Sequence, residues 1–346
     1  MRMKLRYLIG VIALAVAPLH GQPTNGAVYW SATQPDCSSL NESPVTITNT
    51  SGTTIGYSCY VSGTFVWLSA GGVDYKPAKW GTSIRVAAPA SGAVGVDYSF
   101  YDTNGNNLSL DTTGSYTGSG NDVNFALYAN QPAEIDLIGA TSNAPSYSST
   151  ATGSVYAIFY CPDATTCENV LPQLIYSALP TYPWSLSVPI AWDSATWTQW
   201  SAEGIDDGGT HRVSLVIYND DTTATSFAVH VYNSAGTLVG SGTTPSIPPL
   251  QDLGNGNLGE GGTYGALLAD VISTPLPSGI FKVLVDGGSI NSAVEVLQVD
   301  GASATTLQVA YDSAPTTAAA AAVQRSSIRR LRVESRPRRV FNELPK

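Results

Sequence analysis

Short segments rich in β-branched and aromatic residues recur along the chain from residue 23 to residue 315, and each is bounded by Gly, Pro, Asn or Asp. Alternation is clearest in FAVHVYN, where Phe227, Val229 and Val231 share one face of the segment. Helical periodicity is almost absent over the same length. This pattern is typical of antiparallel strands joined by hairpins. We therefore predict an all-β protein in which sheets pack as sandwiches.

The strand-rich region contains an internal duplication. Three pairs of segments match in the same order and at nearly one offset, which is 131 residues in the longest match. Copies of this length are ordinary in size for β-sandwich domains. We therefore predict two tandem domains, residues 22–182 and residues 183–315. The matched pairs are FVWLSAGGVD (65–74) with WTQWSAEGID (197–206), residues 83–105 with residues 214–236, and LIYSALP (174–180) with QVAYDSAP (308–315).

Two segments of the chain resemble known modules. VTITNTSGTTIGYSCYVSGTFVWLSAGG (45–72) resembles the start of bacterial BACON-type and other immunoglobulin-like modules. RVSLVIYNDDTTATSFAVHVYNSAGTLVG (212–240) is similar to fibronectin type III-like repeats, with Asn219 ending a strand and Gly236 in a hairpin turn. The resemblance implies two tandem immunoglobulin-like β-sandwich domains in an adhesive or carbohydrate-associated setting. It supplies no catalytic residues.

The first residues of the chain have the pattern of a secretory signal peptide. Basic residues in MRMKLR precede the apolar run YLIGVIALAVA at residues 7–17, which is too short to span a bilayer. We expect residues 1–21 to be removed on export. Every later apolar run is broken by Gly, Pro, Asp or Asn. The sequence thus predicts a protein that a bacterium secretes or holds in its cell envelope, without a transmembrane segment in the mature chain.

Four cysteines in an exported protein favour two disulfide bonds, because such compartments are oxidising. Three pairings are possible. Sequence proximity favours Cys37–Cys59 and Cys161–Cys167. A zinc site is the weaker interpretation, since neither pair has a CxxC spacing or a nearby His.

Charge divides the chain into an acidic body and a basic tail. Between the leader and residue 325 the chain carries 24 acidic and five basic residues, whereas residues 325–346 carry eight basic and two acidic residues. An acidic body repels nucleic acid and anionic lipid, so neither is expected as a partner. Residues 316–346 combine an alanine run with seven Arg and lack a strand pattern. They are expected to be disordered or to form a short helix, with electrostatic docking on envelope polymers or on the acidic body as a functional alternative.

Candidate catalytic groups are few. After the leader the only histidines are His211 and His230, and no nucleophile-elbow, zinc-protease or phosphate-loop motif occurs. Paired carboxylates for glycoside hydrolysis exist as Glu134 with Asp136 and as Asp206 with Asp207. A hydrolase is therefore the third choice of function, and no catalytic residue is assigned.

No cofactor is expected, although a structural calcium ion is an alternative. Oxygen ligands suit this hard cation, and the candidate ligands are Asp102, Asn104, Asp206 and Asp207. None of these has the spacing of an EF-hand loop. The turn-forming chemistry of Asp, Asn and Gly explains the same residues without an ion.

The tryptophans have two interpretations, a sugar-binding surface and a packed core. Trp197 and Trp200 align with Phe65 and Leu68 in the duplication, so Trp197, Trp200 and Phe65 are predicted to be structural. Trp184 aligns with Gly52 and has no aromatic counterpart, which makes Trp184 and the neighbouring Tyr182 candidates for a ligand-facing surface or for a domain interface. Trp192 falls on Tyr60, so it is compatible with either role.

The favoured function is a secreted, non-catalytic adhesive, scaffolding or envelope-associated protein whose partner is an extracellular or envelope polymer, including a polysaccharide. The alternative is a carbohydrate-binding protein that uses the aromatic residues Tyr182, Trp184 and Trp192.

Overall fold

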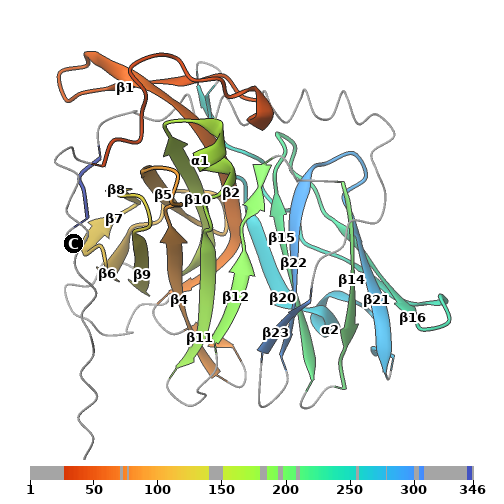
Figure 1. Cartoon of the computed structure of the whole chain (residues 1–346). Coiled ribbons are helices and arrows are strands. Elements are labelled where there is room, and N and C mark those ends of the chain that lie inside the picture. The colour runs from red at the N-terminus through yellow and green to blue at the C-terminus, as the bar shows by residue number, and fades with distance from the viewer. Residues whose placement is uncertain are drawn as a thin grey trace, which may run out of the picture.

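The structure is a computed structural model that describes residues 27–70, 73–75, 78–139, 151–179, 185–193, 198–207, 211–254, 257–277, 279–299, 304–307 and 341–344. These residues are nearly all β, and the strands pair in antiparallel sheets (Figure 1). The predicted all-β class is confirmed. The leader and most of the basic tail lie outside the described residues.

Two sheets from residues 45–192 face each other and form what we call the N-terminal sandwich. The first sheet has the order β1-β2-β10-β5-β8, with β13 pairing on β2, and the second has the order β12-β11-β4-β9-β6-β7, with β3 pairing on β4. The strands are β1 (Val45–Thr48), β2 (Thr54–Ala70), β3 (Val73–Tyr75), β4 (Ala78–Ala87), β5 (Val94–Asp102), β6 (Leu110–Gly114), β7 (Gly118–Gly120), β8 (Asp122–Leu127), β9 (Pro132–Gly139), β10 (Ala151–Cys161), β11 (Gln173–Leu179), β12 (Ser185–Pro189) and β13 (Ala191–Trp192), with short helices η1 (Ser38–Leu40) and α1 (Ala164–Glu168).

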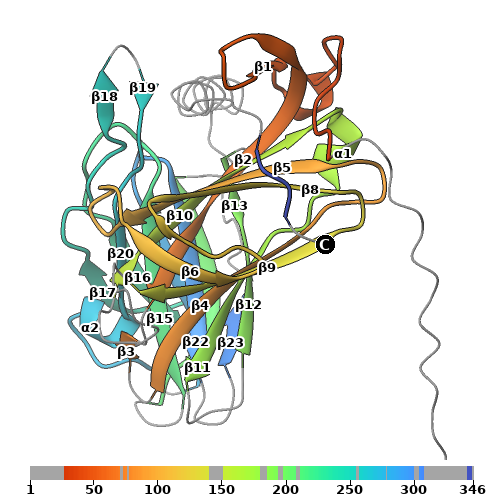
Figure 2. The ribbon, with the colours of Figure 1, turned by 90° about the vertical axis from the view of Figure 1, so that its left-hand side faces the viewer.

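Two further sheets form the C-terminal sandwich. Their orders are β14-β21-β16-β17 and β20-β15-β22-β23, and β18 with β19 makes a separate hairpin that projects from one end (Figure 2). The elements are β14 (Gln199–Ile205), β15 (Arg212–Asn219), β16 (Ala228–Asn233), β17 (Leu238–Thr243), β18 (Asp252–Gly254), β19 (Asn257–Leu258), β20 (Thr263–Leu267), α2 (Leu268–Val271), β21 (Ile280–Asp286), β22 (Ser292–Val299) and β23 (Ala304–Leu307).

The two sandwiches repeat one strand topology. In chain order, β2, β4, β5, β8, β9, β10, β11 and β12 occupy the sheet positions that β14, β15, β16, β17, β20, β21, β22 and β23 occupy in the other sandwich. The first two sequence matches fall on equivalent strands, β2 with β14 and β4–β5 with β15–β16. The third match differs, because the counterpart of β11 by sheet position is β22 and residues 308–315 lie outside the described residues.

Strand pairing also bears on the expected division at residue 182. β12 and β13 follow that position in sequence, yet β12 pairs with β11 and β13 pairs with β2. The change of sheet therefore falls between Trp192 and Gln199.

The strand order differs from that of a constant immunoglobulin domain. Of the eight strands that the two sandwiches share, the first pairs with the sixth, β2 with β10 and β14 with β21, and the first and second strands lie in different sheets. In a constant immunoglobulin domain the first two strands, A and B, share a sheet.

Each sandwich encloses its own apolar core. Alternate residues of the facing sheets meet in it, such as Phe65 and Val96 from one sheet with Ile84 and Leu174 from the other. In the C-terminal sandwich Val229 and Val283 face Leu215 and Val296 in the same way. The period-two pattern read in the sequence thus corresponds to inward-facing positions.

A β-bulge in β2 joins the two sandwiches. Between the pairs Val155↔Phe65 and Gly153↔Leu68, the two residues Val66 and Trp67 oppose a single residue of β10. Val66 is buried against Val216, Tyr218 and Ala293 of the C-terminal sandwich, with Leu250 in the same cluster. The bulged carbonyls are satisfied from outside the ladder: the Thr263 hydroxyl donates to Val66 O at 2.7 Å, and the Tyr176 hydroxyl donates to Trp67 O at 2.8 Å.

Both predicted disulfides, Cys37–Cys59 and Cys161–Cys167, are present. Phe341–Leu344, within the tail expected to be disordered or to form a short helix, makes a β-bridge at Glu343 and buries two side chains against the N-terminal sandwich. The burial of Phe341 and Leu344 explains the difference, since composition arguments average over the Arg-rich residues and overlook a short apolar motif.

Candidate functional site

A hollow of about 560 Å³ opens beside Trp192 on the N-terminal sandwich. Its volume is in the range of small-ligand sites. Side chains from η1, β2, α1, the α1–β11 loop, the start of β11, β12, the β12–β13 turn and β13 surround it. They are Leu40, Val61, Ser62, Cys167, Glu168, Val170, Leu171, Pro172, Gln173, Ser187, Pro189, Ile190 and Trp192.

β13 carries Trp192 to the hollow by lying close against β2. It pairs Ala191 with Thr64 and Trp192 with Gly63. A Cβ atom on residue 63 would lie 2.5 Å from Ala191 O and 2.9 Å from Trp192 Cα, so glycine permits this approach.

Asp193 fixes the chain just after Trp192. Its Oδ2 atom accepts hydrogen bonds from the Ser62 hydroxyl at 2.7 Å and from the Tyr156 hydroxyl at 2.9 Å. All three residues are buried. Because a buried carboxylate is costly unless it is hydrogen-bonded, these two donors hold Asp193, and thereby Trp192, in one place.

Trp192 is half-buried and serves both the core and the hollow. Its ring meets Phe159 edge to face, with centroids 6.1 Å apart and planes at 71°. The same side chain packs against the N-terminal core and lines the hollow. The packing fixes the Trp192 indole in position. This favours binding, because the side chain has little conformational entropy left to lose.

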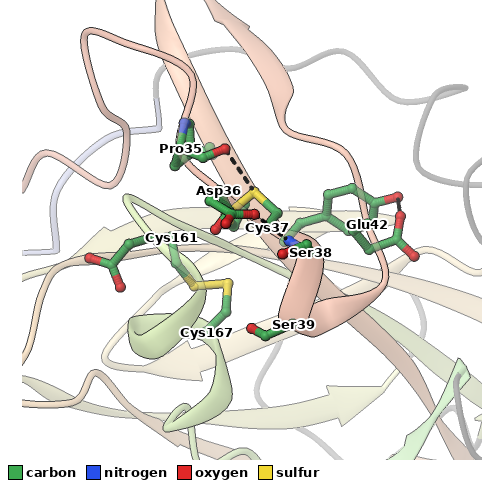
Figure 3. The surroundings of a disulfide bond; sticks show 12 residues. Pro35, Asp36, Cys37, Ser38, Ser39, Glu42, Cys161 and Cys167 are labelled. Atoms are coloured by element: carbon green, nitrogen blue, oxygen red, sulfur yellow. Dashed lines mark hydrogen bonds between the residues drawn. A yellow bond between two sulfur atoms is a disulfide. The ribbon is translucent and has the colours of Figure 1, made fainter.

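A disulfide bond constrains the rim of the hollow. Cys161 at the end of β10 and Cys167 in α1 are bonded across a six-residue separation. Asp163 caps α1 by accepting a hydrogen bond from Thr166 N–H at 2.8 Å. η1 lies against α1 beside the Cys161–Cys167 disulfide (Figure 3). The Ser39 hydroxyl donates a hydrogen bond to Glu168 at 2.7 Å. These local constraints place Glu168 and Leu171 at the mouth.

The mouth combines apolar area with hydrogen-bonding groups. Leu171 is 69% exposed, and Glu168, Gln173 and Ser187 are exposed polar side chains around it. No Lys or Arg belongs to the described lining. An anionic ligand would therefore find no positive charge at this site, whereas a neutral polyhydroxylated ligand would find an indole, an amide, a carboxylate and a hydroxyl.

The structure describes two of the other predicted aromatic residues, Trp200 and Phe65. Tyr182, Trp184 and Trp197 lie outside the described residues. Trp200 is 9% exposed in the C-terminal core, and its indole N–H donates to Ser292 O at 3.1 Å. Phe65 is buried in the N-terminal core.

The calcium candidates have turn-forming interactions. Asp102 accepts hydrogen bonds from the backbone N–H groups of Asn104 and Asn106, at 2.8 Å and 2.9 Å. Asp206 accepts one from Val213 N, and Asp207 accepts one from His211 N. Among the described residues no group of three His, Cys, Asp or Glu side chains could hold a metal ion. The hydrogen bonds account for these residues without an ion. Structural calcium stays an untested prediction.

The carboxylate pairs considered for hydrolysis have other partners. Glu134 forms a salt bridge of 3.0 Å with Arg85, and both side chains are exposed. Asp136 follows two residues later on β9, and burial and then the nearby Glu134 raise its pKa. His211 Nδ1 lies 3.1 Å from Asp207 Oδ2. Neither pair lines the hollow beside Trp192.

Sequence reasoning missed Asp193, Ser62 and Glu168. Asp193 follows Trp192 directly in IAWDS, which is a usable signal because an acidic residue next to an apolar run often ends a strand. Ser62 is 131 residues away from Asp193, so nothing in the sequence links them.

No protein-family model, no curated protein and no solved structure matches the chain. Two disulfides are typical of proteins that reside in an oxidising compartment outside the cytoplasm. Within the described part of the chain, no helix has the length and apolar character needed to cross a membrane.

Proposed function

We propose that this protein is an exported, non-catalytic adhesive module of two tandem β-sandwich domains, and that it binds a neutral saccharide in the hollow beside Trp192. The observation that carries the proposal is the position of Trp192, whose indole lines a hollow of ligand size next to exposed Glu168, Gln173 and Ser187. Aromatic faces pack against the apolar C–H face of a sugar ring, and polar groups at the edge bind its hydroxyls.

The charge of the protein supports a neutral ligand. The body of the chain has 24 acidic and five basic residues, and the described lining of the hollow carries Glu168 without a Lys or Arg. Anionic polymers would be repelled by this field. A neutral glycan avoids that repulsion, and Glu168 can accept hydrogen bonds from its hydroxyl groups.

Glycan-array screening followed by calorimetry tests the proposal. Trp192→Ala should weaken binding of the best glycan at least tenfold, which corresponds to about 1.4 kcal/mol. Leu171→Ala, at the mouth, should weaken it less. Leu238→Ala removes a comparably exposed leucine on β17, and it should bind like the wild type. Unchanged affinity in Trp192→Ala, or no glycan bound at all, would contradict the proposal.

Scaffolding in the cell envelope is the second candidate, and it is favoured by the contact between the sandwiches. Val66 and Trp67 of the bulge pack against the C-terminal sandwich, and Thr263 bonds to the Val66 carbonyl. A scaffold needs this fixed orientation and does not need the hollow. Co-sedimentation with isolated bacterial envelopes should then persist in Trp192→Ala. Loss of co-sedimentation in that variant would favour the saccharide site alone.

A further inference from the structure

Phe341–Leu344 occupies an edge of the N-terminal sandwich like a bound peptide. β8 is the last strand in its sheet, and this segment forms a parallel bridge beside it at Ala126 and Glu343. Ala126 N–H donates to Asn342 O at 2.9 Å, and Leu344 N–H donates to Ala126 O at 3.3 Å. Figures 1 and 2 show the segment in dark blue beside this sandwich. The contact is strand addition, a recurring mode of peptide recognition.

Ala126 is oriented to receive such a strand. It lies opposite Gly95 of β5 in the antiparallel register, and both its N–H and its C=O bond to the segment. Consecutive positions in an antiparallel pair alternate between bonding to the partner strand and facing away from it. Ala126 is at a position that faces away, so the edge presents one donor and one acceptor to a docking peptide.

Aromatic residues form a platform for Phe341. Its ring stacks on Tyr29 with centroids 5.4 Å apart, and it tilts against Tyr160 at 5.8 Å. Phe341 N–H also donates to the Tyr29 hydroxyl at 3.0 Å. Phe341 is only 7% exposed. Burial of one aromatic side chain in this way contributes about 2 kcal/mol.

The other two anchors give the site its selectivity. Glu343 accepts hydrogen bonds from Ala27 N–H at 2.8 Å and from the Tyr128 hydroxyl. Leu344 is 5% exposed and joins the N-terminal core. The Asn342 side chain is exposed and is not an anchor. The site therefore recognises an extended peptide with the pattern aromatic, any residue, acidic, aliphatic.

The length of chain between β23 and Phe341 allows the segment to reach a second molecule. Residues 308–340 separate β23 from Phe341. A chain of that length spans up to about 110 Å when extended. Seven Arg lie in residues 325–339, immediately before the segment, whereas the body is strongly acidic. Opposite charges on tail and body attract the tail of one molecule to the body of another and speed their encounter.

We propose that this groove, formed by Tyr29, Ala126, Tyr128 and Tyr160, is a strand-accepting site whose partner is a second copy of this chain. Phe341–Leu344 of one copy takes the place of the resident segment in the other. Copies are thereby linked through the tail. In a single molecule the tethered segment competes at an effective concentration in the millimolar range, so exchange between copies is favoured where the protein is concentrated on a surface.

Two complementary full-chain variants test the exchange. Phe341→Ala with Leu344→Ala keeps the groove and loses the segment. Ala126→Pro keeps the segment and loses the N–H donor; proline is tolerated on an edge strand where the N–H faces away from the sheet. Each variant alone should sediment as a monomer, and an equimolar mixture should form a one-to-one complex. A chain carrying all three changes should join neither partner. Absence of the mixed complex at about 1 mM, the tethered concentration, would overturn the proposal.

A synthetic peptide provides a second measurement that does not depend on Ala126→Pro folding. Fluorescein-labelled VFNELPK, the sequence of residues 340–346, should bind the Phe341→Ala, Leu344→Ala chain at least tenfold more tightly than the wild type, whose groove is filled. The peptide with Asn342→Ala should bind equally, and the peptide with Phe341→Ala should not bind. Equal binding of all peptides, or none to the opened groove, would refute the site. Peptide binding without a mixed complex would overturn the exchange between copies.

Discussion

The Ser62 hydroxyl lies 2.7 Å from the Asp193 carboxylate, although 131 residues separate them in sequence. This bond and that from Tyr156 connect β13 to the centre of the first sheet. We predict that Asp193→Ala lowers the free energy of unfolding by about 3 kcal/mol, because two buried hydroxyls lose their acceptor. It should also weaken saccharide binding, since Trp192 loses its anchor. Urea titration and calorimetry measure the two effects.

The control for Asp193 is Asp122→Ala, which removes an exposed carboxylate from β8. It should change the free energy of unfolding by less than about 0.5 kcal/mol. Asp193→Asn retains one acceptor oxygen, so its loss of stability should be smaller than that of Asp193→Ala. Equal stability of Asp193→Ala and the wild type would show that the bonds do not hold β13.

A second prediction concerns Gly63, which lets β13 approach β2. In Gly63→Ala the new Cβ atom meets Ala191 O at 2.5 Å, so β13 must shift. We expect a loss of stability of about 1 to 3 kcal/mol, as for other overpacked sites, and a weaker saccharide affinity. Thermal melting and calorimetry report on both. Gly120→Ala is the matched control, because the nearest atom to its Cβ lies at 3.7 Å. Similar effects of the two substitutions would contradict the role of Gly63.

Much of the architecture was predictable because local pattern determines it. Alternating β-branched residues gave the strands, and the duplicated pattern at residues 83–105 and 214–236 marked β4–β5 and β15–β16. The disulfides followed from proximity, since Cys161 and Cys167 flank a short turn. These signals concern residues that are close in the chain or identical in two copies.

The remaining features depend on contacts between distant residues. The bulge at Val66 and Trp67 is set by pairing with β10 and by the sandwich packed on it, and the sequence of β2 shows neither. Phe341 belongs to a segment whose composition suggests disorder, and its partner Tyr29 is about 300 residues away. For the same reason Trp192 could be named as a candidate, while the hollow around it could not.

The disulfides should contribute unequally to stability. In the chain-entropy description the contribution grows with the length of the closed loop, and the sequence separations are 22 for Cys37–Cys59 and six for Cys161–Cys167. Replacing the first pair by Ala should lower the free energy of unfolding by about 3 kcal/mol, and replacing the second by about 2 kcal/mol. Urea titration checks the order. Replacing Cys161 and Cys167 by Ala should also weaken saccharide binding, because α1 forms the rim of the hollow. If replacing this pair cost more stability than replacing Cys37 and Cys59, the entropic account would be contradicted.

The last prediction is a pH dependence set by Glu295, which is 5% exposed on β22. Burial raises the pKa of its carboxyl to about 8, and a hydrogen bond with Tyr176 opposes this rise. The unfolded chain ionises near the ordinary pKa of 4.5. Between these two values the folded state holds the extra proton, so the free energy of unfolding falls with rising pH by up to about 1.4 kcal/mol per unit.

Glu295→Gln should remove this dependence, because the amide is neutral in both states. In urea titrations from pH 5 to pH 8 the variant should lose less stability than the wild type, and it should be the more stable protein at pH 8. Glu203→Gln, which changes an exposed carboxylate on β14, serves as the control and should follow the wild-type profile. The Tyr176 hydroxyl, which donates to the bulged Trp67 carbonyl, lies beside Glu295, so Glu295 ionises next to the contact that joins the sandwiches. Parallel profiles for Glu295→Gln and the wild type would show that the Glu295 carboxyl ionises alike in the folded and unfolded chains.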